Sequence, residues 1–346
     1  MNNFKNILVV RTDRIGDVVL TTPAVRALRQ AYPNARITML IAPTTFDLVS
    51  GNPDIDVIIL DDRKKVHNGV LGFWRLVFEL RSKKFDLAIN FYTKRRTNLL
   101  CFLAGVPMRV GYFDKNYGFL LTDPIEDNRA AGIKHEARYC LDVLERIGIH
   151  DDNLEYLLPL QGRAQVWARQ FFENHDLGKK VPVFAIHPGA SCPAKRWPVE
   201  RFVALMENLH QKYLATFIMV GANDAHEATK QILVNTAFPV FDLTNKTTVG
   251  QLAGILSRCR LLVSNDSGPV HIADALDVPV VSIFTRNQPG INPERWRPVG
   301  PKSRYVAPPP YKDRAFAKSR FFDAKMLENV TVDEVLEAVD AIFKLC

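Results

Sequence analysis

Cysteine is scarce in this chain of 346 residues, and long apolar runs are missing. The five cysteines are odd in number, lie far apart and form no CxxC pair, which argues against a disulfide framework and a zinc site. No stretch of 18 apolar residues occurs, and residues 1–6 lead straight into a short apolar segment without the pattern of a signal peptide. We therefore expect a protein of the reducing cytoplasm that is neither exported nor spans a membrane.

Two common nucleotide-binding motifs are also absent. The chain has neither GxGxxG nor GxxxxGK[ST], so a dinucleotide-dependent dehydrogenase and a P-loop enzyme lose their main support. Long runs of Lys and Arg are lacking too, which disfavours a nucleic-acid binder. The net charge is nevertheless +8, and the first 150 residues hold 22 basic against 16 acidic residues. That excess suits a phosphorylated or otherwise anionic partner.

Short β-branched runs alternate with longer segments of helical period, which is typical of parallel βαβ units. We expect strands at Ile7–Val10, Arg36–Ile41, Val57–Leu60, Asp86–Phe91, Val183–His187, Thr216–Val220, Leu261–Ser264 and Val280–Phe284. A polar, acidic break at residues 151–162 separates two such series, and the length exceeds what one hydrophobic core usually organises. The predicted fold class is α/β, with Rossmann-like domains at residues 1–160 and 161–330 facing across a cleft.

The end of the chain has a different character. Residues 289–310 are rich in Pro and Arg, which predicts an irregular loop. By contrast, Val332–Leu345 has the spacing of an amphipathic helix. We assign residues 331–346 to a closing C-terminal helix.

The first candidate site follows strand Ile7–Val10. Its sequence, RTDRIGD, lies at the carboxyl end of the strand, where open α/β sheets bind their ligands. Gly16 permits a tight turn, and Asp17 begins a helical segment, so its carboxylate is either a helix cap or a ligand-facing group. The turn itself needs no charge, so the two arginines in the loop, Arg11 and Arg14, favour an anionic ligand nearby.

A second candidate site follows strand Val183–His187. In its sequence, HPGASCPAKRWP, the small residues Ala190 and Ser191 let backbone amides approach a phosphate, and Lys195 adds a compact positive charge. Pro198 is expected to open a helix at its first position. An ordinary Gly/Pro loop with solvated basic side chains is the alternative interpretation.

A third candidate site, SNDSGPVH, joins the end of strand Leu261–Ser264 to a helix. Asp266 and Ser267 are expected to cap that helix, while the amides of Ser267 and Gly268 point out of its positive end and form an anion site. The plainer interpretation makes Asp266 only a cap and His271 a satisfied helix histidine.

Together these sites resemble the ADP-heptose:lipopolysaccharide heptosyltransferases, glycosyltransferase family 9. The resemblance rests on residues 11–17, on PAKRWP at 193–198, which is especially similar to the heptosyltransferase II branch, and on NDSGPVH at 265–271. The motifs occur in the order of the family, and residues 34–41 and 293–296 extend the similarity. The resemblance implies the GT-B fold, with an N-terminal acceptor domain, a C-terminal nucleotide-sugar domain, inverting chemistry, no cofactor and no required metal.

The resemblance also implies a role for individual residues. Asp17 would be the general base, and Lys195 would contact the diphosphate of the donor. The loop that cradles this diphosphate would be formed by Asp266, Ser267, Gly268 and His271. An acidic residue after Val220-Gly221 would hold the ribose or adenine; Asp224 and Glu227 both qualify, and we favour Glu227.

The function predicted in this way is transfer of heptose from ADP-L-glycero-D-manno-heptose to the inner core of lipopolysaccharide. The acceptor would be anionic, and its candidate contacts at the ligand-facing edge are Arg11, Arg14, Lys94, Arg95 and Arg96. A merely solvated charged face is an equal alternative for the run 94–96. An acceptor displayed on the inner leaflet predicts peripheral contact with the cytoplasmic face of the inner membrane.

One loop departs from the family pattern. After strand Val280–Phe284 the family usually has a Gly-Pro-Thr type loop, whereas this chain has TRNQP at 285–289, where the donor sugar would lie. A family-9 transferase that uses another nucleotide sugar for a surface glycan therefore stays open. A non-catalytic nucleotide- or glycan-binding protein on the same scaffold is a further alternative, against which intact Asp17, Lys195 and Asp266 speak.

Overall fold

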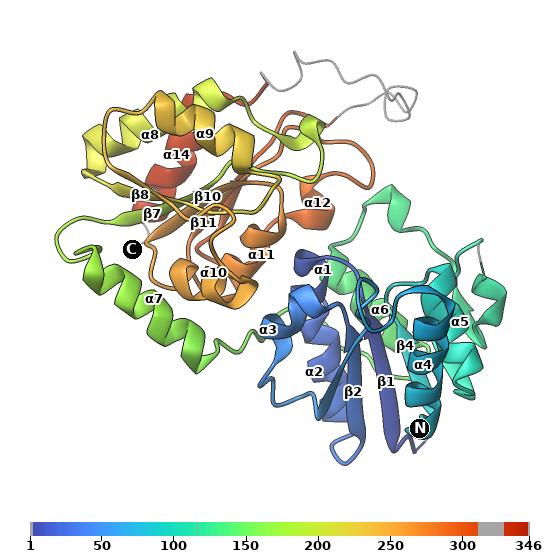
Figure 1. Ribbon diagram of the computed structural model, residues 1–346. Helices are drawn as coiled ribbons and strands as arrows, with labels where there is room; N and C mark the ends of the chain where they lie inside the picture. Colours follow the sequence, from blue (N-terminus) through green and yellow to red (C-terminus); the bar gives the residue numbers. More distant parts are fainter. Residues whose placement is uncertain (1–2, 116, 311–328, 345–346) are drawn as a thin grey trace. The chain divides into compact units, whose positions relative to one another are not determined.

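A computed structural model of the protein describes residues 3–115, 117–310 and 329–344. The chain folds into two compact units (Figure 1). The first unit comprises residues 1–130 and 136–159, and the second comprises residues 131–135 and 160–346. The short segment 131–135 joins the second unit through Asn292, whose Nδ2 donates to the carbonyl of Gly132 at 3.0 Å.

The first unit is a six-stranded parallel sheet in the order β3-β2-β1-β4-β5-β6. Its strands are β1 Asn6–Arg11, β2 Arg36–Ile41, β3 Val57–Leu60, β4 Leu87–Asn90, β5 Met108–Tyr112 and β6 Asp123–Ile125. Its helices are α1 Ile15–Val19, α2 Thr22–Ala31, α3 Phe46–Val49, α4 Gly69–Ser82, α5 Arg95–Leu103 and α6 Glu136–Glu145. Residues 7–10 of β1 are fully buried, which explains a continuous apolar run in place of alternation.

The second unit is a parallel sheet of the same size, in the order β12-β11-β10-β7-β8-β9. Its strands are β7 Val183–His187, β8 Thr216–Met219, β9 Val240–Asp242, β10 Leu261–Asn265, β11 Val280–Ile283 and β12 Arg304–Val306. Its helices are α7 Gly162–Asn174, α8 Val199–Tyr213, α9 His226–Val234, α10 Val249–Leu256, α11 Gly268–Ala275, α12 Pro293–Trp296 and α14 Val332–Phe343.

The last helix, α14, belongs to the core of the second unit. Figure 1 shows it beside α8, and Val335, Val339 and Ile342 are buried in one cluster with Phe184 and Phe202. The predicted helical end at Leu345 lies outside the described residues. The closing helix thus contributes directly to the apolar core around β7 and α8.

Two expectations from the sequence were wrong. Residues 289–310 are not irregular throughout, because they contain α12 and the edge strand β12, which pairs with β11. A strand of three residues takes its definition from its neighbour, so its own sequence carries little pattern. Pro198 is the N-cap of α8 and not its first helical residue, with an extended backbone at ψ 141°.

Both sheets are parallel, so the loops after their strands meet at one edge of each sheet. The three candidate sites follow β1, β7 and β10, and the last two are neighbouring strands with Ser264 opposite His187. None of the described helices has both the length and the apolar composition needed to cross a membrane.

Candidate active site

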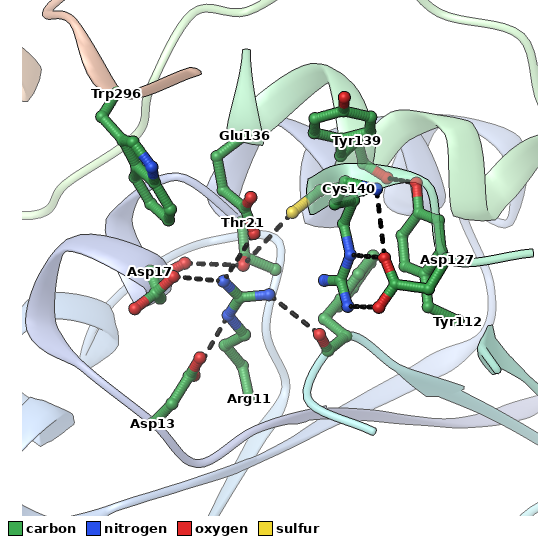
Figure 2. A network of polar contacts seen from close by, with 12 residues as sticks. Arg11, Asp13, Asp17, Thr21, Tyr112, Asp127, Glu136, Tyr139, Cys140 and Trp296 are labelled. Atoms are coloured by element: carbon green, nitrogen blue, oxygen red, sulfur yellow. Dashed lines mark hydrogen bonds and ion pairs between the residues drawn. The ribbon is translucent and has the colours of Figure 1, made fainter. Parts of the chain in front are cut away.

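In the first unit, the side chain of Arg11 organises the site at the carboxyl end of β1 (Figure 2). The guanidinium is buried and lies within ion-pair distance of three carboxylates. Its Nη2 is 2.7 Å from Oδ1 of Asp17 and 3.1 Å from Oε1 of Glu136, and its Nε is 3.1 Å from Oδ1 of Asp13. Nη1 donates to the carbonyl of Phe91 at 3.0 Å. Arg11 therefore ties β1, α1, α6 and the end of β4 together.

Asp17 lies in the first turn of α1, and its position is fixed at both ends. Its carboxylate is held by Arg11, while its backbone carbonyl accepts a hydrogen bond from Oγ1 of Thr21 at 2.8 Å. The side chain is 14% exposed, so an incoming hydroxyl can still reach it. The residue is not the cap of its helix, because the N-cap position belongs to Arg14.

The three carboxylates around one guanidinium carry an excess of negative charge in a buried place. The pKa of Asp13 is raised to about 7, chiefly by burial; the charge of Asp17 contributes to the rise, and Arg11 opposes it. The group therefore retains a proton at a pH where isolated carboxyls have lost theirs. Burial alone would lower the pKa of Arg11, but Asp13 and Asp17 raise it above its ordinary value.

Glu136 is a site residue that the sequence did not reveal. It is the first residue of α6, lies 125 positions after Arg11, and is buried. No motif surrounds it. Only the packing of α6 in the same unit brings its carboxylate to the end of β1, so a local pattern could not have identified it.

The basic residues predicted to face the acceptor are in different environments. Arg14 is exposed, as are Lys94 and Arg95 at the start of α5. Arg95 lies over the ring of Tyr117, with its Cζ 5.2 Å from the ring centroid. Arg96, in contrast, binds the buried Asp61 with two of its nitrogens, at 2.7 and 3.0 Å.

In the second unit, Asn265 connects the two predicted phosphate loops. This buried residue ends β10; its Nδ2 donates to the carbonyl of Pro188 at 2.7 Å, and its Oδ1 accepts from the backbone of Trp197 at 3.0 Å. The loop after β11 is attached as well, because Oγ1 of Thr285 donates to the carbonyl of Ala194 at 2.8 Å. Three neighbouring strand ends therefore form one connected surface.

Lys195 and Asp266 form an ion pair on this surface. Lys195 ends a short 3-10 helix, Pro193–Lys195, and Asp266 lies in the turn before α11. The structure thus brings together the charged residues of the two loops. Both side chains are largely shielded from solvent, which strengthens an electrostatic contact there.

The expectation that Asp266 and Ser267 cap α11 with their side chains was wrong. Ser267 occupies the N-cap position, but its hydroxyl makes no cap hydrogen bond and lies 2.9 Å from Nδ1 of His187. The hydroxyl of Ser264 is 3.2 Å from the same nitrogen. The amides at the start of α11 are consequently not satisfied by these side chains.

His187 is buried and also reaches Asp224, with its Nε2 3.4 Å from Oδ2 of that carboxylate. The hydrogen bond from His187 lowers the pKa of Asp224, against the effect of burial. Gly221 allows this approach: its φ is 135°, and a Cβ there would lie 2.7 Å from Cδ2 of His187. The sequence indicated His187 only as part of a loop, and its role depends on contacts far along the chain.

The remaining donor-site candidates differ in exposure. Glu227, in the first turn of α9, is exposed, with its Oε1 3.4 Å from Nζ of Lys230. In the loop after β7, Ala190 is buried and Ser191 is exposed. His271 is buried within α11.

Comparison with known proteins agrees with these features. The family model of glycosyltransferase family 9 (heptosyltransferase) matches residues 73–323. Lipopolysaccharide heptosyltransferase 2 of Escherichia coli K12 is 27% identical, over 97% of this chain and 98% of that protein.

Two solved structures show the same architecture. The glycosyl transferase family 9 protein from Veillonella parvula superposes with a TM-score of 0.88 at 25% identity, over 99% of this chain and 98% of the other. The E. coli heptosyltransferase WaaC with ADP gives a TM-score of 0.70 at 17% identity, over 97% and 99%. The predicted fold class is confirmed: two Rossmann-like parallel sheets that match the GT-B fold of the heptosyltransferases.

Proposed function

Because the chain belongs to glycosyltransferase family 9, we propose that it is an inverting heptosyltransferase of lipopolysaccharide core synthesis. Its donor would be ADP-L-glycero-D-manno-heptose and its acceptor the anionic inner core. Support comes from the match to lipopolysaccharide heptosyltransferase 2 along nearly the whole of both chains. That WaaC was solved with ADP supports an adenine nucleotide as the carrier of the sugar.

The observation that carries the proposal is the orientation of Asp17. A buried guanidinium holds one side of its carboxylate, and the rest stays partly exposed at the end of β1. In the reaction, this carboxylate takes the proton of an acceptor hydroxyl as the hydroxyl oxygen attacks the anomeric carbon. The bond from that carbon to the diphosphate oxygen breaks on the opposite face, so the configuration inverts and ADP leaves with the bonding electrons.

The loops of the second unit would stabilise the departing diphosphate. Lys195 supplies a cation, and the amides of Ser267 and Gly268 at the start of α11 supply hydrogen-bond donors aligned with the helix dipole. The backbone of Ala190 and Ser191 completes the cradle. On donor binding, Lys195 would exchange part of its contact with Asp266 for the phosphate oxygens.

Glu227 is the better candidate for the ribose hydroxyls. Asp224 is engaged by the buried His187, whereas Glu227, near the start of α9, is exposed and its partner Lys230 is exposed as well. A carboxylate accepts hydrogen bonds from two vicinal hydroxyls, which suits ribose.

The acceptor would be held by the exposed cations of the first unit. Arg14, Lys94 and Arg95 are accessible for phosphate or carboxylate groups. Arg11 instead holds the base, and Arg96 is engaged with Asp61, so we assign these two a positioning role. Transfer would take place at the cytoplasmic face of the inner membrane, where the protein is a peripheral component.

A panel of nucleotide sugars tests the donor. The purified protein is incubated with ADP-heptose and with other ADP-, UDP- and GDP-sugars, and ADP release and the anomeric configuration of the product are measured. Transfer from ADP-heptose with inversion supports the proposal. Transfer from another nucleotide sugar alone would support a family-9 enzyme of different specificity, and binding without transfer would support a non-catalytic protein.

The acceptor is tested in cells. Mass spectrometry of the core oligosaccharide from a deletion strain should show a core truncated at a heptose, restored by the intact chain but not by Asp17→Asn. An unchanged core would contradict the assignment to this pathway.

A further inference from the structure

Helix α4, Gly69–Ser82, is apolar on both of its faces. Its inner face, with Leu76, Val77 and Leu80, is buried in the core of the first unit. Its outer face exposes four large apolar side chains, with exposed fractions of 73% for Val70, 87% for Leu71, 41% for Trp74 and 64% for Phe78. Packing in the core explains the apolar residues of the inner face, but not those of the outer face.

The four exposed side chains form one stripe. Positions 70, 71, 74 and 78 follow the spacing of a single helix face, and the rings of Trp74 and Phe78 are 5.9 Å apart. Single exposed apolar residues are ordinary, whereas a contiguous stripe of them marks a surface that binds something apolar.

Basic residues surround the stripe. Residues 63–84 contain seven Lys or Arg and a single acidic residue, Glu79. The exposed cations that precede, interrupt and follow the stripe are Lys64, Lys65, Arg75, Arg81, Lys83 and Lys84. Lysine is depleted at protein–protein interfaces, so the lysines around this stripe disfavour a protein partner. Aliphatic and aromatic side chains bordered by cations instead match the interface of a bilayer that carries anionic lipids.

We propose that the outer face of α4 docks this protein on an anionic phospholipid bilayer, with the helix lying in the plane of the interface. At 14 residues α4 is too short to span a bilayer, which needs about 20. The apolar stripe would enter the boundary of the acyl chains, and the surrounding Lys and Arg would meet phosphate groups. This inference rests on the proposed function, because it supplies the surface by which an enzyme reaches a lipid-anchored acceptor.

Helix α4 lies beside α5, whose start carries the candidate acceptor contacts Lys94 and Arg95 (Figure 1). Arg96 of α5 donates to the carbonyl of His67, just before α4, at 3.2 Å. Its Cζ also lies 5.2 Å from the ring centroid of Phe73. The docking face therefore begins close to the basic end of α5, so lipid headgroups would be presented near Lys94 and Arg95.

Vesicle sedimentation tests the proposal without donor or acceptor. The protein should bind vesicles of phosphatidylcholine and phosphatidylglycerol and bind pure phosphatidylcholine much more weakly, with added salt reducing the difference. Leu71→Ser with Phe78→Ser should weaken binding at least about tenfold. Lys64→Gln with Lys65→Gln should have an effect of about the same size, since each cation removed costs roughly fivefold.

A matched control separates this surface from exposed apolar residues in general. Val234, at the end of α9 in the second unit, is 85% exposed, and Val234→Ser should leave vesicle binding unchanged. Brominated lipid should quench the tryptophan fluorescence of the intact protein. This quenching should fall strongly in Trp74→Phe, because Trp74 would lie among the acyl chains.

Three results would overturn the proposal: equal binding to both vesicle types, full binding by the Leu71→Ser with Phe78→Ser variant, or a dimer that these two changes dissociate in light scattering. A parallel transfer assay with a delipidated acceptor in solution keeps the two proposals distinct. The docking variants should transfer normally in that assay. Failure of the unchanged protein to bind vesicles, with transfer intact, would reject only the docking surface, and vesicle binding without any transfer would reject only the proposed function.

Discussion

The guanidinium of Arg11 fixes the geometry around Asp17, and only an arginine could do so. It uses Nη1 for a backbone carbonyl, Nη2 for Asp17 and Glu136, and Nε for Asp13. A lysine has a single nitrogen on a flexible stem and could not fill these positions together. The proposed base thus depends on a residue whose own side chain is buried.

Replacing Asp17 by Asn should abolish transfer while leaving the fold intact. The amide keeps the shape of the side chain but cannot accept the proton of the acceptor hydroxyl, so the rate should fall ~10²–10⁴-fold. The affinity for ADP should not change, since ADP would bind residues of the second unit. Steady-state kinetics and calorimetric titration with ADP measure both. A variant that keeps more than half of the activity would show that Asp17 has only a structural role.

Asp13→Asn should change the pH dependence of stability. The folded state raises the pKa of this carboxyl to about 7, so between about pH 4 and 7 the folded chain holds a proton that the unfolded chain has lost. Stability therefore falls as the pH rises through that window. The Asn variant lacks this loss. Its free energy of unfolding, relative to that of the wild type, should therefore increase by on the order of 1 kcal/mol or more between pH 5 and pH 8.

Thermal unfolding of both proteins at the two pH values tests this expectation. The stability of the Asn variant relative to the wild type should be higher at pH 8 than at pH 5. A difference between variant and wild type that is the same at both values would show that Asp13 is ionised throughout.

Among the elements, the loops after β7 and β10 make up the proposed diphosphate site. Their backbones are connected by Asn265, and their charges meet in the pair of Lys195 with Asp266. Because Asp266 already holds the side chain of Lys195 at a partly desolvated site, that side chain loses less conformational freedom when a ligand binds. The pair therefore prepares the site for an anion.

Lys195→Ala should weaken binding of ADP much more than binding of adenosine. A charge-assisted contact to phosphate contributes about 1.5 to 3 kcal/mol, which corresponds to roughly 10- to 150-fold in Kd. Calorimetric titrations with the two ligands measure this, and Lys180→Ala, which removes an exposed lysine of the same unit, is the control. Equal weakening of both ligands would mean a disturbed loop, and no weakening of either would remove Lys195 from the site.

Sequence patterns predicted the strands that have a continuous apolar run and missed those that lack one. The expected bounds of β2, the edge strand β3 and β7 agree with the structure, whereas the interior strand β5, MRVGY, was not predicted. The edge strands β6, β9 and β12 have three residues each and were not predicted. Pro124 within β6 also argues against a strand by local rules, although proline is tolerated at an edge.

The same contrast applies to the site. Residues in contiguous motifs, such as Asp17 and Lys195, could be chosen from the sequence, and so could their place at strand ends. Glu136 and His187 could not be given roles, because their partners lie far away in the chain. The pairing of Arg96 with Asp61 was hidden for the same reason.

On the scale of the whole molecule, each unit carries one half of the proposed chemistry. The first unit holds the carboxylate base and the exposed cations, and the second holds the loops suited to a diphosphate. The excess of positive charge in the first 150 residues agrees with an anionic acceptor and an anionic lipid surface on the same unit. Each half can therefore be disabled separately, which makes the variants above informative.

The last prediction is that transfer by the intact protein persists in excess EDTA. Many transferases neutralise the diphosphate with a divalent ion held by carboxylates. Here the corresponding loops offer Lys195 and the amides of α11, and no group of three potential ligand side chains occurs among the residues that the structure describes. Of the adjacent acidic pairs, Asp61-Asp62 has its first carboxylate bound to Arg63 and Arg96, which lower its pKa against the effect of burial. Initial rates with EDTA, and after addition of Mg²⁺ or Mn²⁺, should be equal. An activity lost in EDTA and restored by either ion would contradict a charge-stabilised departure of ADP by protein groups alone.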